Sequence, residues 1–362
     1  MKRCLLAAVV LLLFVTRCHA SQPELWEPLG LDELSRVGEQ YGTGVELSET
    51  PQLEGGIERL LEQALAHLPD VLRSGLRSAL MLLVVVVLCS MAEGLRAVGG
   101  EESGLNICVL AGALAITALS ANDMSSMMGL GRRTIDSMQG FSQVLLPVVA
   151  ACTAATGAAA KAAARQVATA LFSTLLLGMI DRLLLPLVYA YVAACTACAA
   201  VGNPGLKKVA GVLKWVVTRS LTTLLILFVT YLSLSGAIAG TTDAAALKAA
   251  KMAISTAVPV VGGIISNAAE SILVGAGLLK NAVGVFGMMV VLGICTVPFL
   301  QLGTHYLTYK FTGALAATLA DRRLAELIDG ISTAFALVLG MTGASALLLL
   351  VSIFSAVAGG AA

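Results

Sequence analysis

The sequence predicts an all-α fold: a polytopic membrane bundle of about seven or eight spanning helices, with a short extracytoplasmic N-terminal region. Of the 362 residues, 58% are hydrophobic and only 12% are charged, whereas a typical soluble domain is about 25% charged. Apolar runs of about 20 residues, the length that crosses a bilayer, recur along the chain. The net charge of +1 gives no basic surface for nucleic acid.

The first segment, residues 1–20, has the pattern of a signal peptide: two basic residues, an apolar core and a small-residue cleavage site ending at Ala20. An uncleaved anchor is the alternative, and either places the following residues outside the cytoplasm. Residues 21–75 are expected to form an extracytoplasmic region ending in an amphipathic helix. From Ile57 its apolar residues follow the spacing of one helix face. This helix either lies on the membrane or binds a partner, or it packs on its own protein.

The rest of the chain divides into two membrane regions. Residues 76–239 are expected to hold the N-terminal membrane helices, with a polar, methionine-rich connection at 122–140. Residues 240–362 form the C-terminal membrane region, in which a segment broken by proline and glycine, 240–282, is a candidate re-entrant loop. The expected spans are 76–92, 104–121, 141–160, two crossings within 166–201, 220–239, 283–303 and 331–358.

The positive-inside rule gives the expected topology. An outside start places three basic clusters in the cytoplasm, beginning at Lys161, Lys207 and Lys310. Arg132 and Arg133 then lie outside, against the rule.

Prolines and glycines interrupt several apolar segments. Proline removes a helical hydrogen bond and kinks or breaks a helix, and irregular backbone at membrane depth persists only where protein or a water-filled cavity covers it. Small residues four apart let helices approach closely. Ordinary packing within one subunit is the alternative to a role in assembly or a conduit. The candidates are Pro147, Pro186, Pro259, Gly262, Gly263, Pro298, Gly236 and Gly240.

Four polar residues inside apolar runs are candidate intramembrane sites: Asp181, Arg182, Asn267 and Glu270. A charge at the centre of a span costs about 2.5–3.5 kcal/mol on insertion scales, so such residues usually have a function. The alternative for Asp181-Arg182 is a turn at the membrane surface between two crossings. The alternative for Glu270 is the solvated face of a surface helix.

The sequence carries no catalytic signature and no metal-ligand spacing. The pair Cys195-x-x-Cys198 lies in an apolar run without a second pair or a nearby histidine, which favours cysteines that act as small apolar residues. No enzyme activity and no cofactor are therefore expected.

The order of leader, short external region, amphipathic helix and polytopic body resembles the stage III sporulation protein AE family of endospore-forming bacteria. The most specific parts are VPVVGGIISNAAESILVGAGLLKNAVGVFG at 258–287 and its continuation at 296–331. The resemblance implies a non-enzymatic subunit of the channel, or feeding tube, between mother cell and forespore, which late forespore sigma-factor activity requires.

The resemblance also implies a location and partners. The protein would reside in the mother-cell-derived membrane around the forespore. Its partners would be the bilayer, an ATPase, a ring-forming subunit and small membrane subunits, and a homo-oligomer is a further alternative. The competing hypothesis is a stand-alone secondary transporter or permease. That hypothesis requires a polar site at the bilayer midplane, for which Asp181, Asn267 and Glu270 are the candidates.

Overall fold

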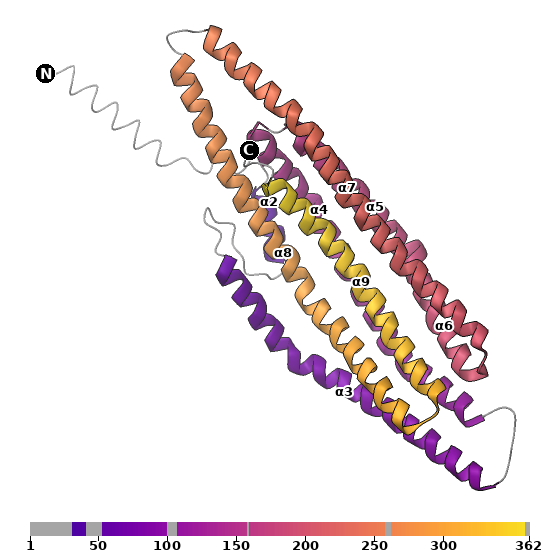
Figure 1. The fold of residues 1–362 in the computed structure, drawn as a ribbon. Helices are drawn as coiled ribbons and strands as arrows, with labels where there is room; N and C mark the ends of the chain where they lie inside the picture. Colours follow the sequence, from indigo (N-terminus) through magenta and orange to yellow (C-terminus); the bar gives the residue numbers. More distant parts are fainter. Residues whose placement is uncertain (1–30, 41–52, 100–106, 158, 258–261, 359–362) are drawn as a thin grey trace.

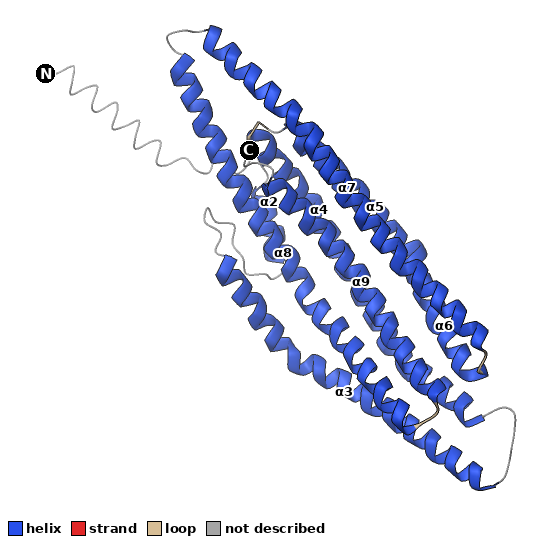
Figure 2. Ribbon diagram, in the orientation of Figure 1, coloured by secondary structure: helices blue, strands red, loops and turns tan. Residues whose placement is uncertain are grey.

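The computed structural model describes residues 31–40, 53–99, 107–157, 159–257 and 262–358, and in these residues every regular element is a helix. The all-α prediction is therefore confirmed for the described chain (Figures 1 and 2). The elements are α2 (Leu31–Gln40), α3 (Leu53–Gly99), α4 (Ile107–Ala155), α5 (Ala159–Met179), the π-helical turn η2 (Ile180–Leu184), α6 (Leu185–Val201), α7 (Pro204–Ala257), α8 (Gly262–Leu319) and α9 (Arg322–Ala358).

Six long helices in the described chain contain a segment apolar enough to cross a membrane. In this count α5, η2 and α6 form one continuous helix. The shortest of the six, α9, has 37 residues, which is about 55 Å at 1.5 Å per residue. A hydrocarbon core is about 30 Å thick, so each of these helices is long enough to cross it once and extend beyond it. The membrane bundle is confirmed, with six candidate spans in the described residues where the sequence suggested seven or eight.

The methionine-rich segment 122–140 is part of α4 and not a connection. The prediction was wrong because polar residues alternate there with a helical stripe of buried residues. Gly131, Thr134, Ile135 and Met138 repeat three and four residues apart and face the bundle. The polar residues between them occupy the outer face of the same helix.

Asp181 and Arg182 do not form a turn between two crossings, because they lie in η2, which continues α5 directly into α6. The amide of Leu185 donates to the carbonyl of Ile180, one residue further back than in an α-helix. Pro186 explains this widening, since a proline has no N–H and its ring would clash with the carbonyl of Arg182, four residues earlier.

The continuous α5–η2–α6 helix also corrects the expected topology. Lys161 and Lys207 lie near its two ends and therefore at opposite ends of the bundle (Figure 1). A single cytoplasmic side cannot hold both clusters. The cluster that begins at Lys207 does share one end with Arg322 and Arg323, the last residues of the cluster that begins at Lys310. The α6–α7 and α8–α9 turns lie together at that end.

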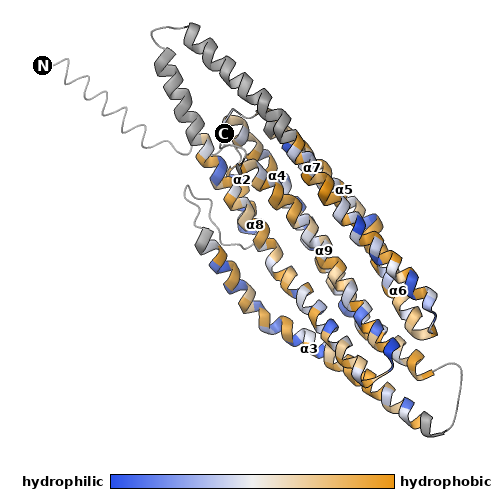
Figure 3. Ribbon diagram, viewed as in Figure 1, coloured by the Kyte–Doolittle hydropathy of each residue, from blue (hydrophilic) through white to orange (hydrophobic). Residues whose placement is uncertain are grey.

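The core is centred on α8 and α9. In α9, 61% of the most apolar window is buried, and in α8 50%, against 11% in α3 and 17% in α7. Phe286 and Phe335 are among the largest fully buried side chains of the two central helices. The outer helices carry apolar residues on their outward sides as well (Figure 3), as lipid-facing helices do.

The amphipathic helix continues without interruption into the first span, as one helix α3 that contains Pro69. Leu60 and Val71 are buried, whereas Leu61 and Leu65 are exposed. Helix α3 lies along α8. One side of the helix thus packs on its own protein, and the other presents leucines outward.

Candidate functional site

The predicted prolines do not assemble into one site. Pro147 lies inside α4 and is exposed, and Pro298 lies inside α8 and is half-buried. Both helices continue through their proline, so neither residue ends a helix. Pro186 occupies the first turn of α6 and is exposed.

The remaining candidates lie at the α7–α8 end of the bundle. Gly236 and Gly240 are within α7, Gly262 and Gly263 begin α8, and Asn267 and Glu270 follow in its first turns. Pro259 falls outside the described residues. The segment 240–282 is helical up to Ala257 and again from Gly262, so the expected re-entrant loop has no counterpart among the residues that the structure describes.

The outer face of α4 is the most unusual surface for a membrane helix. Between Leu119 and Val167 the described chain exposes no large hydrophobic residue. We call the exposed residues of this part of the helix the α4 polar face: Ala121, Asn122, Ser125, Ser126, Arg132, Arg133, Asp136, Gly140, Gln143, Pro147, Ala151 and Ala155.

The neighbouring helices are apolar where this face is polar. Met138 of α4, Leu176 of α5 and Leu348 of α9 line one small pocket, so the three helices are at the same level there. Close to that level α5 exposes Leu171 and Leu175. The α4 polar face therefore lies close to exposed leucines of α5 that are suited to lipid.

Charges extend this face onto η2. The Nε of Arg132 lies 3.3 Å from the Oδ1 of Asp181, with the two side chains 58% and 27% exposed. Arg133, Asp136 and Arg182 are exposed as well. Turning Arg132, Asp181, Arg133 and Asp136 toward hydrocarbon would cost on the order of 10 kcal/mol, at about 2.5–3.5 kcal/mol each at the centre of a span. That cost indicates that the face is covered by protein or by water.

Hydrogen bonds across the bundle fix the helices behind this face. The Tyr309 hydroxyl donates to the Oδ2 of Asp123 at 2.8 Å, which joins α8 to α4. The hydroxyls of Thr117 and Thr196 lie 2.9 Å apart and join α4 to α6. Sequence reasoning missed the Tyr309–Asp123 bond, because no local pattern relates two residues 186 positions apart.

Between α4, α5 and α9, the described residues leave no cavity large enough for a midplane substrate. Two pockets between α4, α5 and α9 have volumes of about 20 Å³ each, which is room for one water molecule. Asp181, the midplane candidate whose side chain is described, lies on the outside and pairs with Arg132. No group of three or more His, Cys, Asp or Glu residues suited to a metal occurs in the described part of the chain.

These features define a polytopic, all-helical membrane protein with a polar outer face among its membrane-spanning segments. The family described as stage III sporulation protein AE matches residues 45–360. The chain belongs to this family.

A curated relative, the stage III sporulation protein AE of Bacillus subtilis (strain 168), is 21% identical over 258 residues. The match covers 69% of this chain and 63% of the relative, so the chain spans less than two thirds of that protein's length. No solved structure matches the chain significantly.

Proposed function

We propose that this protein is a non-enzymatic, multi-pass subunit of the channel, or feeding tube, between mother cell and forespore, and that late forespore sigma-factor activity requires it. It would reside in the mother-cell-derived membrane around the forespore. Family membership supports the sporulation role. The α4 polar face is the observation that supports a role as a subunit.

The composition of the face suits a protein partner. Gly140, Pro147 and Ala151 leave little side-chain bulk, so that another helix can approach closely. Arg133 and Asp136 offer charges of both signs that a partner can pair or hydrate. In a stand-alone permease only water could cover these charges, whereas in a subunit a partner helix can cover and pair them.

The bundle also suggests an orientation. Six crossings place both ends of the membrane region on one side, and a mature N-terminus outside the cytoplasm makes that side extracytoplasmic. The end with Lys207, Lys208, Arg322 and Arg323 then faces the mother-cell cytoplasm, as the positive-inside rule favours. An ATPase partner would dock at this end, and ring-forming and small membrane subunits would contact the bundle within and outside the bilayer.

Affinity purification from sporulating cells tests the proposal. The tagged chain would replace the host's own protein, and mass spectrometry would identify what co-purifies in mild detergent. We expect the other stage III channel proteins with the wild-type chain. Arg133→Glu should reduce their recovery at an unchanged amount of membrane-inserted protein, because it reverses a charge of the α4 polar face.

The matched control is Arg77→Glu, which reverses an exposed arginine of another helix, α3, that is not part of the α4 polar face. This variant should retain its partners. A stable wild-type monomer that brings down none of the channel proteins would contradict the proposal.

A further inference from the structure

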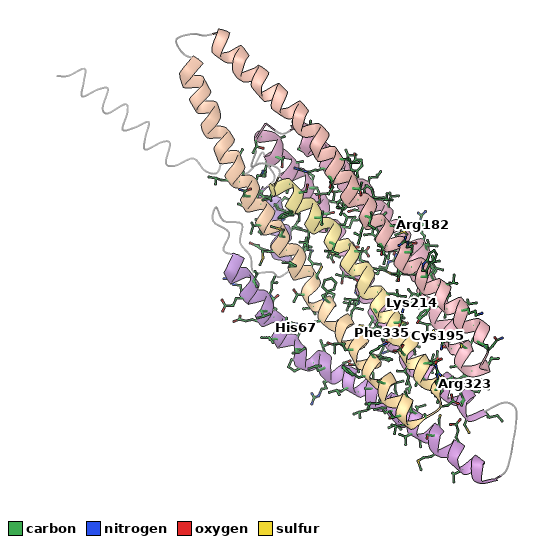
Figure 4. The ribbon with its side chains drawn as sticks, viewed as in Figure 1. His67, Arg182, Cys195, Lys214, Arg323 and Phe335 are labelled. Carbon is green, nitrogen blue, oxygen red and sulfur yellow. The ribbon has the colours of Figure 1, made fainter. Side chains whose placement is uncertain are left out.

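The bundle end formed by α6, α7 and α9 contains a partly open pocket of about 350 Å³. We call it the α6–α7–α9 pocket. Its charged lining residues are Lys207, Lys214, Arg323, Glu326 and Asp329. Figure 4 labels Lys214 and Arg323, which come from α7 and α9, and Cys195 of α6, which also lines the pocket.

Both carboxylates of the pocket already have cationic partners. The Oε1 of Glu326 lies 2.9 Å from the Nζ of Lys207 and 2.9 Å from the Nε of Arg322. Asp329 forms an ion pair with Lys310 of α8. The two carboxylates are therefore paired with Lys207, Arg322 and Lys310, and not with Lys214 or Arg323 of the lining.

The Lys214 and Arg323 side chains have no hydrogen bond or ion pair to any residue that the structure describes. Five cations gather here: Lys207, Lys214 and Arg323 of the lining, and the ion-pair partners Lys310 and Arg322. The three nearby carboxylates belong to Glu326, Asp329 and Asp321. The Oδ1 of Asp321 accepts from the backbone amide of Arg323. The local net charge is +2. The pocket thus presents two cationic side chains, Lys214 and Arg323, without an acidic partner among the described residues.

The turn between α6 and α7 holds Arg323 in place. Gly202 ends α6 with φ at 73°, a left-handed conformation that glycine adopts without strain. A Cβ added to Gly202 would lie 2.7 Å from the Cζ of Arg323. The guanidinium therefore packs directly on this turn, which positions it at the rim of the pocket.

The surroundings of the pocket suit a position at the edge of the bilayer. Ala199, Ala210 and Leu327 form an apolar part of its lining, and Trp215, next to Lys214, is 64% exposed. Exposed tryptophan beside lysine is typical of the headgroup level. Basic pockets between membrane helices on the cytoplasmic side bind anionic headgroups, and arginine and lysine are the common phosphate donors.

We propose that the α6–α7–α9 pocket binds a phosphate group, that of an anionic phospholipid headgroup or of free phosphate, through Lys214 and Arg323. The binding site is independent of the proposed channel function. It concerns the purified chain alone. If channel partners are not recovered, the phosphate-binding proposal still holds, and if phosphate does not bind, the channel proposal still holds.

The test uses the full chain in mild detergent. Native mass spectrometry would measure retained lipid during titration with phosphatidylglycerol, with phosphatidylcholine as the lipid that has a phosphate but no net charge. Calorimetry with inorganic phosphate forms the second arm. Lys214→Gln/Arg323→Gln should weaken phosphatidylglycerol binding about 30-fold, the factor for two basic side chains at about 1 kcal/mol each.

The control is Lys208→Gln, which removes an exposed lysine of α7 that does not line the pocket and should bind as the wild type does. Lys214→Gln alone changes an exposed side chain and keeps the test valid if the double variant misfolds. Binding of phosphatidylglycerol only identifies a headgroup site, and binding of inorganic phosphate that the double variant loses identifies a free-phosphate site. Binding in neither arm, or an equal loss in Lys208→Gln, overturns the proposal.

Discussion

Replacing Tyr309 by phenylalanine isolates one interhelical hydrogen bond. The Tyr309 side chain is 1% exposed, and its hydroxyl donates to the Asp123 carboxylate at 2.8 Å. Its ring packs against Phe335 edge-on, with centroids 5.0 Å apart. Phenylalanine keeps the ring contact and leaves no large cavity, so that the loss of stability reports the hydrogen bond.

The expected loss is about 1 kcal/mol. Hydrogen bonds to charged groups contribute about 1.5–3 kcal/mol in soluble proteins, whereas interhelical bonds in a membrane protein average about 0.6 kcal/mol, with a maximum near 1.7. Asp123 is half-buried and can bind water when the hydroxyl is gone. The residual hydration of Asp123 places the effect between the membrane average of about 0.6 kcal/mol and the lower limit of about 1.5 kcal/mol for charged groups in soluble proteins.

The assay is reversible unfolding of the purified chain by denaturing detergent, followed by circular dichroism. Tyr306→Phe is the control, since it removes a hydroxyl three residues earlier in α8 that has no hydrogen bond among the described residues. We expect Tyr309→Phe to lower the free energy of unfolding and Tyr306→Phe to leave it nearly unchanged. Equal stability of the two variants would refute the account of how α4 is held against α8.

Two further predictions concern packing and the outer face. Gly313→Ala should destabilise the bundle by about 1–3 kcal/mol, because the new Cβ would lie 3.3 Å from the α9 backbone nitrogen of Asp329; Gly303→Ala, with nothing within 4 Å, should be neutral or stabilising in the same unfolding assay. Arg132→Gln should lower stability by about 1 kcal/mol, since Arg132 is 58% exposed although its partner Asp181 is only 27% exposed, and it should also lower the recovery of channel partners from cells. A large loss of stability with full recovery of the channel partners would contradict this prediction, because it would make Arg132 important for folding and not for partner binding.

Composition and apolar run length were sufficient to predict the helical membrane bundle. These properties are summed over many residues, and errors at single positions do not affect them. The division into spans was less accurate, because the sequence reasoning treated polar residues as ends of helices. In α4 the polar residues of 122–140 lie on one face, and the buried stripe through Met138 runs on beneath them.

The candidate site was predicted only in part. Asp181 and Arg182 were selected for their cost in an apolar run, and they do lie on the polar outer surface, but Arg132 was assigned to an external connection. Its pairing with Asp181 depends on the packing of α4 against η2, and no local pattern in either segment encodes that contact. The α6–α7–α9 pocket was missed for the same reason, since Lys214 and Arg323 meet only through the fold.

The central claim is that protein covers the α4 polar face in the membrane. Photo-cross-linking in sporulating cells tests it with a photoreactive amino acid at Gln143 of α4 and, as the matched site, at Leu171 of α5, both exposed. The account predicts adducts with channel proteins or a second copy of this chain from Gln143, and lipid adducts alone from Leu171. Lipid adducts alone from both positions would contradict it.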